Sequence, residues 1–318
     1  MDALITAFLE KSNWGSSSRT QLAGDASSRQ YERLTRFDGT AILMIDPDPK
    51  VVKKFLNVTD ILQTAGYSAP TVLASDIASG LVLLEDFGND LFAWLLTEGA
   101  DEETLYELAT NFLVDLSNQE RPTGLPYFSS NYVLDQNTMF LDWYVPKVTD
   151  KALPDNARFF FQQIWRQLLK NLEDDKEGLL LRDFHAENLV YLPDRDGLKA
   201  LGILDYQDAM TGPAAYDLVS LLQDARRDVS PEIAGKMLDR YIAKSGVDET
   251  EFRRMYAILG AHRALRIMGI FTRLADRDNK PRYLEFMPRM IAHLQTNLTH
   301  PDLLALKYWI TVSIGKLS

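Results

Sequence analysis

The segment LLLRDFHAENLVYLPDRDGLKALGILDYQDA, residues 179–209, decides the fold prediction for this chain. It contains three apolar runs, each short enough to be a single strand and bounded by polar turns: 179–181, 189–191 and 200–204. Asp183 and Asn188 lie after the first run, and Asp205 ends the third. Asp and Asn are common in ordinary turns, so this pair alone is weak evidence for chemistry. The complete series of strand, polar turn, strand and terminal Asp is more specific.

The chain before this segment predicts a small, β-rich lobe. Apolar residues at helical spacing indicate a helix over 53–65, which Gly66 would end. Residues 1–14 have the pattern of an amphipathic helix rather than of a signal peptide. Five further segments have the alternation or the apolar composition of strands: 20–23, 30–36, 40–45, 71–73 and 80–85.

After a predicted hinge near residues 86–89, the pattern becomes mainly helical. The helical segments are 91–96, 102–118, 157–172 and almost all of the chain from residue 214. The sequence therefore predicts an α+β protein with two lobes. A small antiparallel β-rich lobe would cover 1–86, and a large, mainly helical lobe would cover 87–318.

The composition of the 318 residues argues against several classes of protein. The absence of cysteine excludes disulfides and Cys-based zinc sites. Acidic residues outnumber basic residues by 45 to 34, and the net charge of −11 argues against a nucleic-acid partner. No apolar run reaches the length of a membrane helix, which argues against a membrane partner. We therefore predict a cytoplasmic protein that binds a small molecule; the sequence leaves the oligomeric state open.

The polar residues of the opening segment suit phosphoryl transfer. This reaction needs a carboxylate to orient or deprotonate the attacking hydroxyl, and oxygen ligands to hold Mg²⁺ against the phosphates. Asp183 and Asn188 have the D-x-x-x-x-N spacing of a kinase catalytic loop. Asp205, at the end of a strand, would supply the main metal carboxylate. Because residues 213–217 (PAAYD) then open a helix, the compound pattern favours a catalytic site over an ordinary turn.

Three motifs resemble the aminoglycoside phosphotransferase-like branch of the protein-kinase fold: RDFHAEN (182–188), ILDYQDA (203–209) and GPAAYDLV (212–219). Four more stretches look like those of the bacterial anomeric sugar kinases, which phosphorylate N-acetylmuramate and N-acetylglucosamine at C1: GDASSRQYERL (24–34), LLEDFG (83–88), SLLQDARRDV (220–229) and GIFTRLADRDNKPRYLEFMPRM (269–290). The resemblance implies a protein-kinase-like two-lobed fold. It also implies a sugar substrate, ATP and Mg²⁺ as cofactors, and a place in cell-wall sugar recycling.

The resemblance further implies roles for individual residues. Asp183 matches the catalytic base, Asn188 and Asp205 match the Mg²⁺ ligands, and Asp217 matches a buried carboxylate that braces the catalytic loop. The loop that covers the phosphates corresponds to Gly24, Asp25, Ala26, Ser27, Ser28 and Arg29. The hinge, whose backbone would hydrogen-bond adenine, corresponds to Glu85, Asp86 and Phe87.

Candidates for contacts with the sugar are less sharply defined. Asp208 could approach the sugar hydroxyls or cap the following turn. Trp143 and Tyr144 could form an aromatic platform for the sugar, although the helix core is the more frequent place for such residues. Four arginines lie roughly on one side of one helical stretch: Arg263, Arg266, Arg273 and Arg277. They could bind the lactyl carboxylate of N-acetylmuramate or form ordinary surface or lobe-bracing salt bridges, and Arg266 is the one that we select as a site residue.

Two positions depart from the kinase pattern. Leu181 stands where the catalytic-loop motif usually begins with His, and Met44 stands where the third strand usually supplies a Lys for the phosphates. Another cation should therefore balance the charge of the phosphates, and we favour Arg29. The other candidates, each of which could be an ordinary surface charge, are Arg33, Lys50, Lys53 and Lys54.

Two other functions remain open from the sequence. The first is a kinase for an aminoglycoside or for another hydroxylated metabolite. The second is a nucleotide-binding module without turnover, which the departures at Met44 and Leu181 would favour. The intact trio Asp183, Asn188 and Asp205 argues against this second alternative, because an inactive protein has no chemical need for all three side chains.

Overall fold

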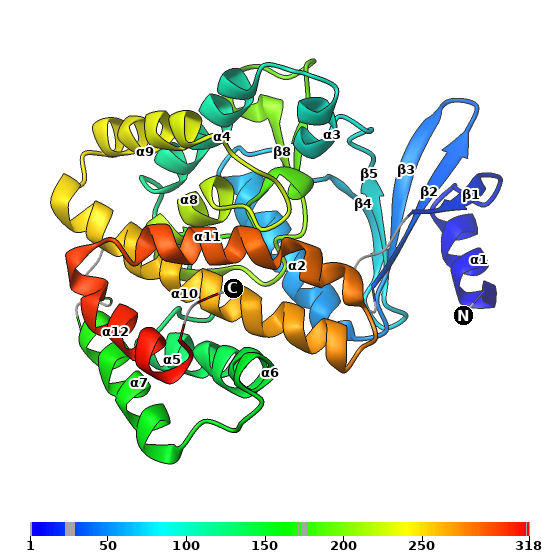
Figure 1. Cartoon of the computed structure of the whole chain (residues 1–318). Helices are drawn as coiled ribbons and strands as arrows, with labels where there is room; N and C mark the ends of the chain where they lie inside the picture. Colours follow the sequence, from blue (N-terminus) through cyan, green and yellow to red (C-terminus); the bar gives the residue numbers. More distant parts are fainter. Residues whose placement is uncertain (1, 23–28, 171, 173–176, 316, 318) are drawn as a thin grey trace. The chain divides into compact units, whose positions relative to one another are not determined.

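The computed structural model describes residues 2–22, 29–170, 172, 177–315 and 317, which form two compact units (Figure 1). The first unit contains Met1–Asp101 and Glu187–Ala209, and the second contains Glu102–Ala186 and Met210–Ser318. An antiparallel sheet in one unit and a mainly helical second unit confirm the predicted fold class. The boundary at residue 86 remains a prediction.

A five-stranded antiparallel sheet with the strand order β1-β2-β3-β5-β4 forms the base of the first unit. Each predicted strand is present, β2 with its predicted bounds and the others with bounds shifted by one to three residues, and helix α2 (Pro49–Thr64) lies between β3 and β4 in the chain. The strands are β1 (Ser18–Gln21), β2 (Gln30–Arg36), β3 (Gly39–Ile45), β4 (Val72–Asp76) and β5 (Leu81–Glu85).

One face of this sheet packs against helix α1 (Asp2–Lys11), which Figure 1 shows beside the strands. Successive side chains of a strand point to opposite faces, so one face can be apolar while the other carries polar groups. The apolar cluster on the α1 face consists of Ile5, Phe8, Leu9, Trp14, Leu34, Ala41, Leu43, Ile45, Leu81 and Leu83. The strand register pairs Tyr31 with Met44 and Arg33 with Ile42. These intervening residues therefore lie on the opposite face.

Helix α2 (Pro49–Thr64) begins four residues before the predicted start at residue 53. Asp48 is its N-cap, and Oδ1 of Asp48 accepts a hydrogen bond from the N–H of Lys50 at 2.9 Å. Pro49 occupies the first turn, where its missing N–H has no helical partner to lose. The Asp-Pro pair was thus a better signal for the helix start than the apolar spacing.

The rest of the first unit combines helix α3 (Phe92–Thr97) with a hairpin from a distant part of the chain. This hairpin consists of β7 (Leu189–Tyr191) and β8 (Leu201–Ile203). Val190 forms a bridge with Leu91, and Gly202 forms one with Ser68. These bridges fix the hairpin, and the turn that follows it, within the first unit.

The second unit is built around the long helix α10 (Glu249–Asp276), which packs against α5 (Ser130–Met139), α8 (Ala215–Leu222) and α11 (Met287–Asn297). A short two-stranded sheet pairs β6 (Glu177–Leu180) with β9 (Met210–Pro213). The sequence does not predict β9, because Gly and Pro in MTGP are typical of turns. The other helices are α4 (Glu102–Leu116), α5 (Ser130–Met139), α6 (Val145–Thr149), α7 (Asp155–Leu168), α8 (Ala215–Leu222), α9 (Pro231–Ser245), α11 (Met287–Asn297) and α12 (Leu304–Ser313).

None of the helices within the described residues is both long enough and apolar enough to cross a membrane.

A π-helical segment, Phe140–Tyr144, follows α5 and packs closely against α10. Gly269 of α10 makes this close approach possible, since a Cβ atom there would lie 2.3 Å from the carbonyl oxygen of Met139. A neighbouring backbone cannot move away as easily as a flexible side chain. The π-helical segment, which carries Trp143 and Tyr144, is therefore fixed by the absence of a side chain at residue 269.

Gly269→Ala should lower the free energy of unfolding by about 1–3 kcal/mol, because the methyl group overpacks a backbone contact. Gly235→Ala in α9 is the matched control, since no atom lies within 4 Å of a Cβ atom there. The control should be neutral or stabilise by up to about 1 kcal/mol, because Ala favours helix formation. Denaturant unfolding followed by circular dichroism measures both. Equal stability of the two variants would contradict the close packing.

Candidate active site

Asn188 and Asp205 flank the β7–β8 hairpin at the same end. Leu189 pairs with Ile203, and the N–H of Leu204 donates to the carbonyl of Asn188 at 2.9 Å. The hairpin thus brings the backbones of the two predicted metal ligands next to each other. Asp205 has a φ of +57°, in the left-handed region that Asp tolerates better than most residues. Its side chain is 46% exposed, so a cation can reach it.

Such a pair of oxygen donors is an incomplete metal site. Among the residues that the structure describes, no group of three or more His, Asp or Glu side chains could hold a metal ion. Mg²⁺ commonly binds one or two protein carboxylates and completes its shell with water and substrate phosphates. An exposed carboxylate and an amide at one hairpin end fit this kind of site, in which a nucleotide supplies the remaining oxygens.

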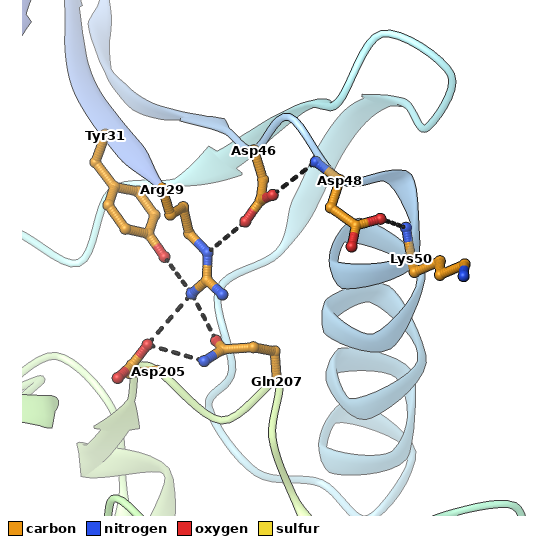
Figure 2. A network of polar contacts seen from close by, with 7 residues as sticks. All are labelled: Arg29, Tyr31, Asp46, Asp48, Lys50, Asp205 and Gln207. Atoms are coloured by element: carbon orange, nitrogen blue, oxygen red, sulfur yellow. Dashed lines mark hydrogen bonds and ion pairs between the residues drawn. The ribbon is translucent and has the colours of Figure 1, made fainter. Parts of the chain in front are cut away.

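Arg29 lies at the centre of a polar network in the first unit (Figure 2). Its Nε donates to Oδ2 of Asp46 at 3.3 Å. Its Nη1 lies 3.2 Å from Oδ1 of Asp205, 2.8 Å from Oε1 of Gln207 and 3.2 Å from the hydroxyl of Tyr31. Because a buried charge is unfavourable without a partner, the carboxylate contacts are what permit Arg29 to be only 8% exposed. These contacts join the strand β2 side of the sheet to the turn after β8.

Two arginines hold the predicted hinge residues. Arg33 forms an ion pair with Asp86 at 2.7 Å, and its Nη2 donates to the carbonyl of Gly88 at 2.9 Å. Arg195 pairs with Glu85 and places its guanidinium 5.1 Å from the centroid of the Phe87 ring. These contacts fix the geometry of the segment that we predict to bind adenine. They also engage Arg33 with the hinge, whereas Arg29 contacts Asp205.

In the second unit, Arg182 is clamped on both sides of its peptide backbone. Oδ2 of Asp217 accepts from the N–H of Leu181 at 2.6 Å, and Oδ1 accepts from the N–H of Arg182 at 2.8 Å. The hydroxyl of Ser220 donates to the carbonyl of Arg182 at 3.0 Å. Arg182 has a φ of +72°, which costs an ordinary side chain about 1–2 kcal/mol. The clamp holds this strained residue and so fixes the direction in which the next one, Asp183, leaves the turn.

Arg263 of α10 extends this clamp. Its Nη2 and Nε donate to Oγ of Ser220 at 2.8 and 3.2 Å. Arg263 is 4% exposed and Asp217 is 2% exposed, so both charges lie out of water beneath the loop. The loop geometry therefore depends on charged groups from α8 and α10, far from Asp183 in the chain.

Burial and nearby charges set the protonation of the two carboxylates. Burial alone would raise the pKa of Asp183, but the charges of His185, Arg266 and Arg182 outweigh it and lower that pKa. Burial raises the pKa of Asp217 to about 7, although its two N–H donors oppose the shift. Asp183 is therefore ionised at neutral pH and can accept a proton or orient a hydroxyl, whereas Asp217 titrates near neutrality.

The aromatic candidates for the acceptor site have different environments. Tyr144 is 3% exposed and stacks on Phe140 with a centroid separation of 5.2 Å, as the helix-core interpretation expects. Trp143, in the same π-helical segment, is only partly buried. Trp143 is therefore the more accessible of the two aromatic candidates. Arg266, the candidate for carboxylate binding, donates from its Nε to Oε1 of Gln136 at 3.0 Å.

Asp208, the remaining acceptor candidate, belongs to the first unit. Asp208 is exposed, and its Oδ1 lies 3.8 Å from Nζ of Lys54.

The two residues that depart from the kinase pattern, Met44 and Leu181, are both buried, so each packs as an apolar residue. Five predicted loop residues lie outside the described part of the chain: Gly24, Asp25, Ala26, Ser27 and Ser28.

Several residues of these networks were not predicted as site residues, among them Asp46, Gln207 and Ser220. Asp46 follows the apolar run of β3, as Asp205 follows that of β8, and this shared pattern was the available signal. Gln207 and Ser220 become recognisable only through their contacts, and Arg263, a candidate for carboxylate binding, donates to Ser220 in the clamp.

The comparisons with known proteins identify the family. Residues 18–258 match the model of the phosphotransferase enzyme family. The chain belongs to this family. A curated relative from Caulobacter vibrioides is 37% identical over 97% of this chain and 95% of its own length. A second, from Neisseria meningitidis, is 34% identical over 87% of this chain and 84% of its own length. Both relatives are named N-acetylmuramate/N-acetylglucosamine kinase.

Solved structures of phosphotransferases share the fold. The ADP-bound aminoglycoside phosphotransferase APH(2'')-Ib has a TM-score of 0.64 and 15% identity over 93% of this chain and 99% of that chain. A choline kinase from Streptococcus pneumoniae has a TM-score of 0.65 and 14% identity over 92% of this chain and 99% of that chain. At these identities the comparison shows the fold alone, and it confirms the predicted kinase-like architecture.

This family membership confirms the prediction of a phosphotransferase that acts on a hydroxyl group of its acceptor. The alternative of a binding module without turnover is therefore not retained.

Proposed function

We propose that this phosphotransferase transfers the γ-phosphate of ATP to the anomeric hydroxyl of an N-acetylated amino sugar, N-acetylmuramate or N-acetylglucosamine. The observation that carries the proposal is the 37% identity to the Caulobacter vibrioides kinase over nearly the whole of both chains. A match of this extent covers both units, and thus all the residues that we propose for nucleotide and acceptor binding.

The described residues have the chemistry that this reaction needs. The ionised Asp183 would accept or orient the proton of the attacking hydroxyl. Asn188 and Asp205 would hold Mg²⁺, which, when bound, offsets the negative charge of the phosphates. Glu85, Asp86 and Phe87 would present their backbone to adenine. Trp143, Arg266 and Asp208 are the proposed acceptor contacts, and Arg266 would match the carboxylate that distinguishes N-acetylmuramate from N-acetylglucosamine.

ADP release in the presence of Mg·ATP tests the acceptor class. We expect release that depends on N-acetylmuramate or N-acetylglucosamine, with little release for glucose, choline or kanamycin. Arg266→Gln should weaken use of N-acetylmuramate more than use of N-acetylglucosamine, because only the former carries a carboxylate. Release with kanamycin alone would move the chain to the aminoglycoside kinases, and release with no acceptor of the panel would contradict the sugar assignment.

The pH dependence of kcat should reflect Asp217 rather than Asp183. When Asp217 is protonated, its hydroxyl oxygen becomes a much weaker acceptor for one of the two N–H groups of the clamp, so the strained Arg182 turn loosens. We expect kcat of the wild type to fall as the pH drops below about 7, where Asp217 takes up its proton. Asp183 remains ionised over this range, because its pKa is lowered.

Asp217→Asn should lower kcat at least about tenfold near pH 8, through loss of one clamp hydrogen bond, and should remove the acid limb near pH 7. Asp239→Asn is the control, because Asp239 is an exposed carboxylate of the second unit. The measurement is kcat across the neutral range for the three proteins. An acid limb that persists unchanged in Asp217→Asn would contradict the assignment.

A further inference from the structure

We propose that Arg29 is the phosphate-binding cation of this kinase and that Asp46 and Gln207 are positioning residues that hold its guanidinium. This inference rests on the proposed nucleotide-dependent function. Kinases of this fold usually hold the phosphates with a Lys on the third strand, paired with a Glu from the following helix. Here the strand position is the buried Met44, and α2 contains no Glu. A cation from another part of the chain must therefore hold the phosphates.

Arg29 is positioned by a carboxylate that is itself fixed. Oδ2 of Asp46 accepts from Nε of Arg29, while Oδ1 of Asp46 accepts from the N–H of Asp48 at 2.9 Å. The N–H of Asp46 donates to the carbonyl of Gly80 at 2.9 Å. Gly80 has a φ of +73°, and a Cβ atom there would lie 2.0 Å from the carbonyl oxygen of Asp46. The backbone thus holds Asp46 in place, and Asp46 holds the guanidinium, as a helix Glu does for the usual Lys.

The same network leaves Asp205 available to a metal ion. Nη1 of Arg29 carries two hydrogens but lies within 3.2 Å of three oxygens, from Tyr31, Asp205 and Gln207. If Asp205 turns to Mg²⁺, both hydrogens keep a partner. The exposures agree with a fixed Arg29 and an accessible Asp205. The side chains of Arg29 and Asp46 are 6% and 4% exposed, whereas that of Asp205 is 46% exposed. Arg29 and Asp46 form the fixed part, and Asp205 is the accessible part.

The charges of the network also favour a role with phosphate and metal together. One guanidinium lies between two carboxylates, Asp46 and Asp205, so the three groups carry one net negative charge. A bound Mg²⁺ would reverse this sign and leave Arg29 and the metal as two positive centres. Arg suits this position better than Lys, since its planar fork can donate to a carboxylate and to a phosphate in different directions.

Calorimetric titration with ADP and with adenosine isolates the contacts to phosphate. Arg29→Gln should weaken ADP binding about 10–100-fold through loss of a charge-assisted hydrogen bond, and should leave adenosine affinity within about twofold. Asp46→Asn should weaken ADP binding in the same selective way but less strongly, because Arg29 remains and is only released from its position. Lys50→Ala is the matched control, since Lys50 is an exposed cation near the same network, and its ADP affinity should be unchanged.

Two further variants distinguish a loss of ADP affinity from a folding defect. The double variant Arg29→Gln/Asp46→Asn leaves no unpaired buried charge between the two, so it should unfold close to the wild-type temperature and still bind ADP weakly. Arg29→Lys keeps the charge but loses the fork, and should recover only part of the ADP affinity. An unchanged ADP affinity in the folded Arg29→Gln variant or in the double variant would overturn this inference but not the proposed function. An equal loss of affinity for ADP and for adenosine would do the same. Failure of the wild type to bind ADP would instead overturn the proposed function as well.

Discussion

Asp183→Asn should lower kcat of the proposed amino-sugar kinase about 10²–10⁴-fold, the usual contribution of a positioned general base. The substitution keeps the shape of the side chain, and the N–H of residue 183 can still donate to the carbonyl of Leu181, a bond of 2.9 Å in the wild type. The loop should therefore keep its geometry while losing the only group that we assign to the proton of the attacking hydroxyl. ADP affinity should remain within about twofold, because binding does not use that proton.

A matched control separates the effect of position from the effect of charge. Asp194 is an exposed carboxylate in the turn between β7 and β8, and Asp194→Asn removes the same charge outside the catalytic loop. Its kcat should stay within about twofold of the wild type, as surface substitutions usually do little. Steady-state ADP release and calorimetric ADP binding give both quantities. A kcat for Asp183→Asn within tenfold of the wild type would remove Asp183 from the chemistry.

Asp205→Asn should lower kcat/KM at least about 100-fold and shift the activity to higher Mg²⁺ concentrations. The side chain keeps an oxygen that can accept from Arg29 and Gln207, as Oδ1 does at 3.2 and 3.0 Å in the wild type, so the network can persist. What it loses is the negative charge that is proposed to hold the metal. The effect should therefore appear in the Mg²⁺ dependence more than in folding.

The Mg²⁺ titration of activity distinguishes this assignment from a simple loss of function. Asn188→Ala should shift the titration in the same direction but less strongly, since an amide is a weaker ligand than a carboxylate. Asp194→Asn again serves as the control and should leave the titration unchanged. An Asp205→Asn enzyme with a normal Mg²⁺ midpoint would contradict a metal role for Asp205.

The sequence predicts the strands of the first unit well, because local signals are sufficient there. β2 has the predicted bounds Gln30–Arg36, since its alternating residues end at a hairpin turn. β9 could not be predicted, because MTGP becomes a strand only through pairing with β6, more than thirty residues earlier in the chain. The π-helical segment Phe140–Tyr144 also has no local signal, and its geometry depends on Gly269 in a distant helix.

The candidate site shows the same division between local motifs and distant contacts. The spacing of Asp183, Asn188 and Asp205 identifies the residue types that phosphoryl transfer needs, and the β7–β8 hairpin brings the latter two to one end. The partners of Arg29 could not be predicted, because Asp46 and Gln207 lie 17 and 178 positions away. Motifs thus indicate which groups are candidates for the reaction, whereas tertiary contacts decide how those groups are held.

Phosphorus NMR of the reaction with Mg·ATP and N-acetylmuramate tests the central claim most directly. The account predicts a new sugar 1-phosphate signal that is coupled to the anomeric proton, grows in step with ADP and is absent with Asp183→Asn. A signal from a phosphate on any other hydroxyl, or ADP formed without a sugar phosphate, would contradict it.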